Sequence, residues 1–282
     1  MRSSWKRNIT LYSAQYPFRR FSLVVSYDGS EFFGWQRQSS DFSLFDNTVQ
    51  GAIEAAIYKI TGSWATCYGS GRTDSGVHAL GQVAHFDSDK ISMDGGKLRL
   101  ALNANLPKSI RILECKERFD AFHARFSTFL REYIYMIKSD DMFTALDYNR
   151  VWNVRKKPDI TLLSLMSEMI KGEDKDFKNF DFTNKSIPHT SIRDVLVSEF
   201  FEKNGCIYYR IAGNAFLYHQ VRAIVGTIIE FERRFNEKSV EEFKSFLNSY
   251  EKTHFIAPSF ALYLNRIIYS EKEYEALRSK LC

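Results

Sequence analysis

The order of strand-like and helix-like segments constrains the fold of this chain more than any other feature of its sequence. In the first half, hydrophobic periodicity predicts a strand at residues 21–27, a helix at 47–61, strands at 64–69 and 81–87, a helix at 93–104 and a strand at 109–118. This order is typical of a split β-α-β unit, the ferredoxin-like arrangement. The sequence therefore predicts an α+β lobe.

The same order returns in the second half. It predicts a strand at residues 127–137, a helix at 159–171, strands at 190–202 and 205–213, helices at 215–234 and 239–249, and a closing strand at 261–269. No repetition of the residues themselves accompanies it, so two similar lobes, residues 21–115 and 116–282, are predicted from element order alone. The polar segments 138–158 and 172–189 are predicted to be loops.

Length and composition set the class of protein. A chain of 282 residues with 44% hydrophobic residues can bury one large core or two modest ones. It contains no run of the roughly 20 apolar residues that a membrane span requires, so we expect a soluble protein. The cysteines lie far apart and lack the spacing of a zinc site or a disulfide framework, which favours a reducing compartment; they are Cys67, Cys115, Cys206 and Cys282.

A glycine-rich segment, residues 69–78, places Asp74 two residues after Arg72 and shortly before a predicted strand. Its three glycines permit unusual backbone angles and leave room for a ligand. Because a nearby positive charge lowers the pKa of a carboxyl group, we expect Arg72 to keep Asp74 ionised, and an ionised carboxylate can act as a nucleophile. The alternative is an ordinary turn closed by Asp74. A phosphate cradle is disfavoured, since the segment lacks a Gly-Lys-Ser/Thr ending and opens no helix.

Residues 27–38 and 69–87 closely resemble the signatures of the TruA family of tRNA pseudouridine synthases. Further matches follow in the family's order at residues 102–107, 122–126, 131–135, 214–222 and 257–264. The resemblance spans residues 21–269. One departure lies just before the last strand, where residues 259–262 read Ser-Phe-Ala-Leu and the family tends to have a glycine.

The resemblance implies a pseudouridine synthase fold, an α+β fold of two ferredoxin-like lobes with a mixed, largely antiparallel sheet across a central cleft. It implies an isomerase that converts uridine to pseudouridine in the anticodon stem-loop of tRNA, without metal or cofactor. Asp74 is then the catalytic nucleophile, and Arg222 pairs with it across the cleft. A homodimer that cradles tRNA is also implied. The alternative function is a non-catalytic RNA-binding module on the same fold.

Two further segments are expected to contact the substrate, a strand that carries Tyr133 and a predicted helix that carries His219. Tyr133 shares one face of an alternating strand with Arg131. Tyrosines commonly pack in sheets, but the matched motif favours stacking of the Tyr133 ring on a flipped uracil. In the predicted helix after Asn214, spacing puts His219 on the same side as Arg222, which makes His219 a polar neighbour of the substrate.

Other candidate substrate contacts are basic or polar. Gln36 and Arg37 lie in a loop that interleaves aromatic, amide and basic side chains, a mixture that suits RNA backbones and unstacked bases, although its aromatic residues could equally be part of the core. Arg125 and Arg131 are candidate phosphate contacts. Arg72 and Thr73 are candidates because they flank Asp74.

The net charge of +5 arises at the N-terminus. Residues 1–20 hold five of the 39 Lys and Arg residues and no acidic residue, so residues 21–282 carry 34 basic and 34 acidic side chains. An RNA-binding surface must therefore be a local basic patch. We expect residues 1–20 to be a basic, flexible extension, with an RNA-gripping arm and an organelle transit signal as alternatives. We expect a cytoplasmic protein, or an organellar one if the transit signal is real.

Overall fold

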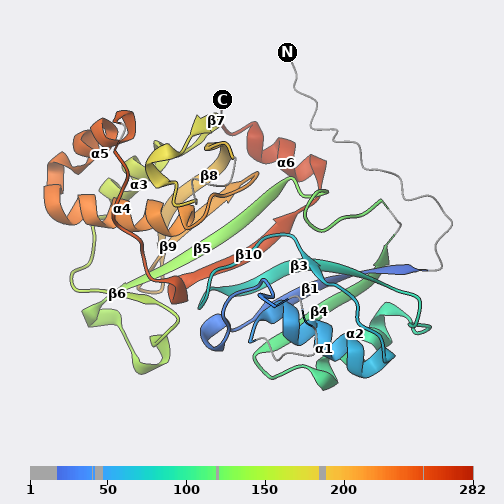
Figure 1. Ribbon diagram of the computed structural model, residues 1–282. Helices are drawn as coiled ribbons and strands as arrows, with labels where there is room; N and C mark the ends of the chain where they lie inside the picture. Colours follow the sequence, from blue (N-terminus) through green and yellow to red (C-terminus); the bar gives the residue numbers. More distant parts are fainter. Residues whose placement is uncertain are drawn as a thin grey trace, which may run out of the picture.

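The computed structural model describes residues 18–39, 41, 47–118, 121–183, 189–249 and 251–281. Its strands form one sheet in the order β4-β1-β3-β10-β5-β9-β8-β7, with β2 paired to β3 and β6 paired to β5 (Figure 1). All of the pairings are antiparallel except those of β10 with β3 and of β5 with β6. The predicted mixed, largely antiparallel sheet is confirmed.

The first half contains β1 (Arg19–Tyr27), α1 (Val49–Thr61), β2 (Tyr68–Gly69), β3 (His78–Ser88), α2 (Gly95–Asn105) and β4 (Ile110–Arg118). Its strands lie in the order β4-β1-β3-β2, the arrangement that the predicted split β-α-β unit requires. The predicted strand at 64–69 shrinks to two residues. Helix α1 is capped by Thr48, whose hydroxyl accepts the amide of Gly51.

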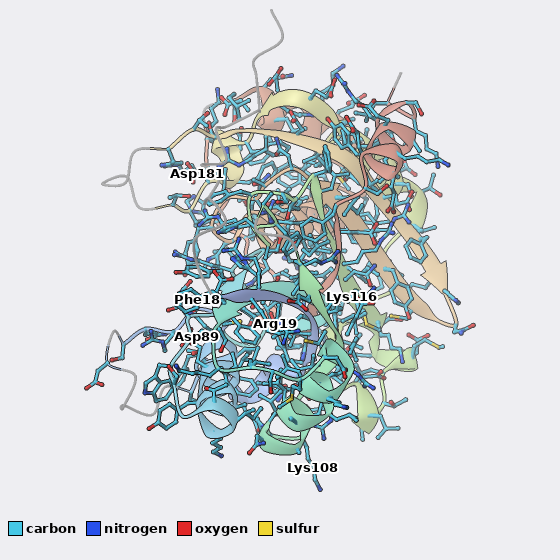
Figure 2. The ribbon with its side chains drawn as sticks, turned by 90° about the vertical axis from the view of Figure 1, so that its right-hand side faces the viewer. Phe18, Arg19, Asp89, Lys108, Lys116 and Asp181 are labelled. Carbon is cyan, nitrogen blue, oxygen red and sulfur yellow. The ribbon has the colours of Figure 1, made fainter. Side chains whose placement is uncertain are left out.

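Strand β1 begins two residues earlier than predicted. Arg19 forms an ion pair with Glu117 at 2.7 Å, and Arg20 forms one with Asp87 at 2.6 Å. Figure 2 shows Phe18 and Arg19 at this end of the sheet. Two of the five basic residues expected in a free N-terminal arm are therefore part of the sheet, while residues 1–17 lie outside the described residues.

The second half contains β5 (Leu130–Ser139), α3 (Ile160–Glu168), β8 (Ile192–Lys203), β9 (Cys206–Gly213), α4 (Gln220–Phe235), α5 (Ser239–Asn248) and β10 (Leu262–Ile268). Its strand order, β10-β5-β9-β8, repeats that of the first half. The recurrence predicted from element order is thus present in space. The boundary predicted at 115/116 falls inside β4 (Ile110–Arg118), so we propose that the two lobes divide a few residues later, in the connection between β4 and β5.

Several short elements were not predicted. The two loops expected at 138–158 and 172–189 contain β6 (Trp152–Val154) and β7 (Gly172–Asp176), and α6 (Glu271–Arg278) follows the last strand. The 3-10 helices are η1 (Gly29–Glu31), η2 (Asp140–Met142), η3 (Ala145–Asp147), η4 (Lys178–Phe180), η5 (Asn236–Lys238) and η6 (Ser259–Ala261). No helix in the described parts of the chain is long and apolar enough to cross a membrane.

The two halves meet where β3 and β10 run parallel. His78 is paired with Tyr263, and Ala79 with Leu264. Because parallel strands begin at the same end of a sheet, the loop that precedes β3 and the segment that precedes β10 come together there. One buried apolar cluster runs through both halves and includes Leu23, Ile53 and Tyr135. The junction is therefore held on a continuous core.

Candidate active site

The loop between β2 and β3, residues 70–77, carries Asp74 and lies against the turn after β1. A Cβ atom on Gly34 would lie 2.5 Å from the Thr73 carbonyl oxygen, and Gly34 also has a φ of +92°. A Cβ atom on Gly29 would lie 2.0 Å from the Val77 carbonyl oxygen. Only glycine permits such a close approach of two backbones. These backbone contacts fix the position of the loop that carries Asp74 relative to the rest of the site.

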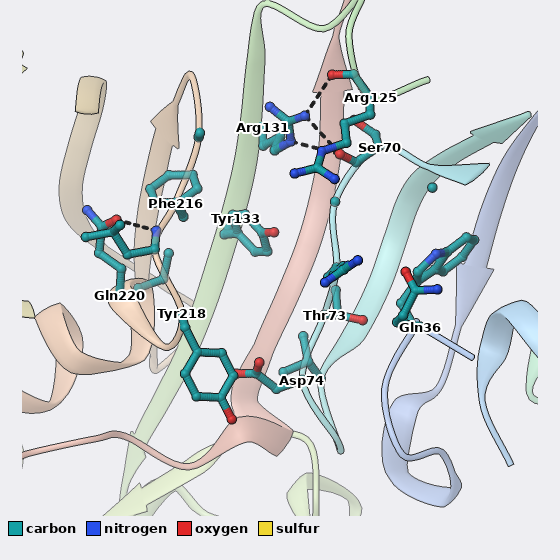
Figure 3. Close-up of a pocket in the computed structure, with 18 of the residues that line it drawn as sticks. Gln36, Ser70, Thr73, Asp74, Arg125, Arg131, Tyr133, Phe216, Tyr218 and Gln220 are labelled. Atoms are coloured by element: carbon teal, nitrogen blue, oxygen red, sulfur yellow. Dashed lines mark hydrogen bonds between the residues drawn. The ribbon is translucent and has the colours of Figure 1, made fainter. Parts of the chain in front are cut away.

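The turn before α4 supplies the other side of the site. Helix α4 begins at Gln220, and His219 before it is left-handed, with a φ of 60°. The predicted helix start at 215 is therefore wrong; His219 precedes the helix, yet it faces the same side as Arg222, as the sequence spacing predicted. The chain reverses here because the Gln220 side-chain oxygen accepts the Leu217 amide at 2.7 Å, a bond that Figure 3 shows. The Tyr218 ring stacks on the His219 ring, and the two ring centroids are 3.7 Å apart.

These two loops bring Asp74 and Arg222 together. A terminal guanidinium nitrogen of Arg222 donates to Asp74 Oδ2 at 3.1 Å, and Nε2 of His219 lies 3.4 Å from the same oxygen. Arg222 is held in turn by the Ala257 carbonyl, which accepts its Nε at 2.8 Å. The Asp74 side chain keeps 23% of its surface exposed, so the carboxylate is both anchored and accessible.

Arg72 is not the cationic partner of Asp74 that the sequence predicted. Its side chain is exposed at the lining of the cleft, and among the described residues it forms no ion pair with Asp74. The carboxylate of Asp74 faces the start of α4, so its cationic partner comes from the opposite half of the chain. Proximity in sequence was the wrong guide, since a partner 148 residues away takes that place.

His219 adds a neutral polar group beside the carboxylate. Burial lowers the pKa of its imidazole, and the positive charge of Arg222 also lowers it, while Asp74 acts in the opposite direction. The depressed pKa leaves His219 predominantly uncharged at neutral pH. Arg222 is then the permanent cation next to Asp74.

Tyr133 lies on β5 at the floor of the site. Its ring packs edge-on against Phe216 with centroids 5.4 Å apart (Figure 3), and a Cβ atom on Gly71 would lie 3.5 Å from its hydroxyl, so Gly71 borders Tyr133 on the side of the Asp74 loop. Burial raises the pKa of the Tyr133 hydroxyl to about 12; Arg131 lowers it and Asp74 raises it further. The hydroxyl is therefore protonated at neutral pH. No hydrogen bond to it is present among the described residues.

Arg131 holds the loops of the site together. Its Nε donates to the Ser70 carbonyl at 3.1 Å, and its terminal nitrogens donate to the carbonyls of Asn214 at 2.6 Å and Arg125 at 3.0 Å. Burial lowers the pKa of its guanidinium. Each nitrogen of the group is thus engaged with backbone, which gives Arg131 a positioning role and leaves it poorly placed for the phosphate contact expected from sequence.

Three further candidates are also occupied by protein contacts. The Thr73 hydroxyl lies 2.8 Å from the buried Tyr27 hydroxyl. Gln36 donates to Gln50 at 2.7 Å, and Arg37 forms an ion pair at 2.7 Å with Glu54, whose side chain is 1% exposed. The remaining candidate, Arg125, has an exposed side chain beside the Phe126 ring. Arg125 and Arg72 are therefore the basic candidates whose charge faces solvent.

The cleft around Asp74 has a volume of about 790 Å³ and is lined by both halves. Sequence reasoning identified most of its centre but missed the wall opposite the glycine-rich loop. That wall includes Phe216 and Tyr218, and further out Thr183, His189 and Arg193. Phe216 and Tyr218 lay inside a matched motif and could have been chosen. Thr183 and His189 come from the polar segment 172–189, which has no periodic signal, and Arg193 lies at the start of the strand that was predicted at 190–202.

The comparisons with known proteins agree with this geometry. The family model described as tRNA pseudouridine synthase matches residues 23–127 and 169–270, which is well over half of the chain. The first stretch contains Asp74 and the second contains His219 and Arg222, while Arg131 and Tyr133 lie between the two stretches. The chain belongs to the TruA family of tRNA pseudouridine synthases. The resemblance found in the sequence motifs is confirmed.

Curated relatives in this family match the chain over nearly its whole length. The tRNA pseudouridine synthase A of Ehrlichia canis is 35% identical over 257 residues, which cover 89% of this chain and all of the relative. The enzyme of Treponema denticola is 38% identical over 251 residues, covering 88% of this chain and 92% of that one. The enzyme of Wolbachia pipientis is 37% identical, covering 89% and 100%.

Proposed function

We propose that this protein converts uridine to pseudouridine in the anticodon stem-loop of tRNA, with Asp74 as the nucleophile. The observation that carries the proposal is the Asp74 carboxylate, accessible in a cleft between two lobes and bonded to Arg222 of the opposite lobe. Membership of the tRNA pseudouridine synthase family supplies the reaction class, an isomerisation.

The reaction breaks the bond between N1 of uracil and C1′ of ribose, turns the base, and joins C5 to C1′. The proton lost from C5 balances the proton gained at N1, so no redox change and no outside energy source are needed. An ionised carboxylate can begin this sequence by attacking either the ribose or the pyrimidine ring. Asp74 is released when the new carbon–carbon bond has formed.

Arg222 serves this chemistry by fixing the carboxylate. Its guanidinium is held by the Ala257 carbonyl, so it meets Asp74 in one orientation. A preorganised cation of this kind orients the carboxylate and costs no reorganisation during the reaction. The neutral His219, at 3.4 Å from the same oxygen, adds a polar contact without a second charge.

Tyr133 is proposed to stack on the extruded uracil. Its buried ring faces the cleft beside Gly71, and Phe216 holds it edge-on from behind. An enzyme that works on a flipped base commonly holds the base against an aromatic face. The negative charge of Asp74 raises the pKa of the Tyr133 hydroxyl, so the two groups interact, and a second proposed role of this hydroxyl is to move a proton.

Arg72 and Arg125 are proposed to contact the RNA backbone at the rim of the cleft, since their charges face solvent. Gln36, Arg37, Thr73 and Arg131 are proposed to shape the binding site rather than to bind phosphate directly, because their polar groups are engaged with protein. The described cysteines Cys67, Cys115 and Cys206 are free and buried, which fits our proposal of a cytoplasmic location.

The first prediction concerns the nucleophile. Asp74→Asn keeps the shape of the side chain and removes its charge, so pseudouridine formation should fall by at least about 1,000-fold while tRNA affinity changes by less than about twofold. The assay incubates unmodified tRNA transcripts with protein and maps pseudouridine by carbodiimide-blocked primer extension. Product confined to the anticodon arm with the unaltered protein is expected. Substantial turnover by Asp74→Asn would refute the role of Asp74.

The second prediction separates the two possible roles of Tyr133. Tyr133→Phe retains the ring and loses the hydroxyl, whereas Tyr133→Ala loses both. If stacking is the main role, the Phe variant should keep at least about a tenth of the wild-type kcat, and the Ala variant should lose about 1–3 kcal/mol of base binding in addition. Equal loss in both variants would show that stacking is not what Tyr133 contributes.

The third prediction concerns assembly. We propose a homodimer, as the family resemblance implies, and large apolar side chains such as Leu100 on α2 and Leu113 on the edge strand β4 are more than half exposed, as a subunit contact would require. Static light scattering at micromolar concentration should give twice the mass of one chain. A monomer under these conditions would contradict the proposal.

A further inference from the structure

His78 is a buried histidine that the proposed chemistry does not use, yet it lies at the junction of the two halves. It is the first residue of β3, four residues after Asp74, and only 3% of its surface is exposed. Its ring stacks on the Tyr263 ring of β10, with centroids 4.7 Å apart. Both ring nitrogens are engaged, and they are engaged with opposite halves of the chain.

The hydrogen bonds assign the proton of the imidazole. The Gly29 amide donates to Nδ1 at 3.0 Å, so Nδ1 carries a lone pair and the ring proton lies on Nε2. Nε2 then donates toward the Phe260 carbonyl at 2.9 Å and the Asn149 carbonyl at 3.1 Å. Gly29 belongs to the first half, whereas Phe260 and Asn149 belong to the second. The neutral Nε2–H form of His78 therefore bridges the lobes.

The second-half partner of His78 belongs to the segment that holds Arg222. In residues 257–260, the Ala257 carbonyl accepts Nε of Arg222, and the Pro258 carbonyl accepts the hydroxyl of Tyr135 at 2.8 Å. The Phe260 carbonyl accepts from His78. A closed circuit of contacts results: from Asp74 along the chain to His78, across to Phe260, back to Ala257, and through Arg222 to Asp74 again.

We propose that His78 is a positioning residue for the proposed Asp74–Arg222 pair, setting the separation of the two groups through the Nε2–H bond to the segment at 257–260. The inference rests on the proposed function of Asp74. Without this bond, the segment at 257–260 is no longer tied to His78. The Ala257 carbonyl can then shift, and the Arg222 guanidinium that it binds is no longer held at one distance from the carboxylate. A small displacement of reacting groups is costly to a chemical step and cheap for binding.

The charged groups around His78 fit its neutral form. Asp28 Oδ1 lies 3.2 Å from Nδ1, but Asp28 is paired through its other oxygen with Arg150 at 2.7 Å. Tyr263 donates its hydroxyl to the Arg150 carbonyl and packs its ring on the imidazole. Burial lowers the pKa of His78, while Asp28 raises it and Arg150 lowers it. A second proton, on Nδ1, would remove the acceptor of the Gly29 amide.

Two substitutions divide the functions of the ring. The side-chain nitrogen of Gln reaches the place of Nε2, so His78→Gln keeps a donor toward Phe260. Asn is shorter and replaces only the Nδ1 side, so His78→Asn keeps an acceptor for Gly29 within the first half. His78→Leu removes both bonds. His85 provides a matched control, since it lies on the same strand, is 2% exposed, and accepts the Ala124 amide at 3.2 Å.

The test measures kcat under tRNA saturation, the tRNA dissociation constant and the thermal unfolding midpoint of each variant. We expect His78→Leu and His78→Asn to lower kcat about tenfold or more with tRNA affinity within about twofold, and His78→Gln to restore most of the lost rate. His85→Gln and His85→Leu should lower the unfolding midpoint but leave kcat unchanged. If His78→Leu does not fold, the comparison of Asn with Gln decides the question.

Two results would overturn the proposal: equal kcat for His78→Asn and His78→Gln, or losses of kcat that follow the unfolding midpoint in the His78 and His85 variants alike. Nitrogen NMR of labelled histidine gives a readout independent of turnover and should show a neutral ring with its proton on Nε2. A protein that makes no pseudouridine at all would refute the proposed function, whereas an active protein with an Nδ1–H or charged His78 would refute only this inference.

Discussion

The parallel pairing of β3 with β10 is the constraint on which the site depends. Its register joins His78 to Tyr263 and Ala79 to Leu264, so the loop that precedes β3 and the segment that precedes β10 meet at one end of the sheet. The first of these carries Asp74, and the second holds Arg222 through the Ala257 carbonyl. Each lobe is a ferredoxin-like unit on its own, and the site arises only where the two are joined.

A second set of contacts keeps that junction rigid. Arg131 binds carbonyls of the Asp74 loop, of the Arg125 turn and of the turn before α4, so three chain segments share one guanidinium. Gly29 and Gly34 let the loop backbone lie directly on the turn after β1. Such bonds, made by buried groups with few alternative partners, are strong and specific. The Asp74 carboxylate, our proposed nucleophile, is therefore presented by a preorganised frame.

Local patterns in the sequence predicted the repeated element order, because long periodic segments encode their own structure. They missed β6 and β7, which are three and five residues long and show no periodicity. Sequence proximity also misled: Arg72 is exposed while Arg222 binds Asp74, and Arg131 binds backbone instead of facing solvent. These outcomes depend on segments 61 to 148 residues apart, which no local pattern contains. Motif matches identified Asp74, Tyr133 and Arg222; only the fold shows how they meet.

The most direct test of this account is the turnover of Arg222→Lys at saturating tRNA, compared with Arg233→Lys on the same helix, whose side chain is exposed and paired with Glu230. Lysine keeps the charge but cannot bind the Ala257 carbonyl and Asp74 with one planar group. The account predicts a loss of about 100-fold in kcat for Arg222→Lys, unchanged tRNA affinity, and no effect of Arg233→Lys. Near-normal turnover by Arg222→Lys would contradict it.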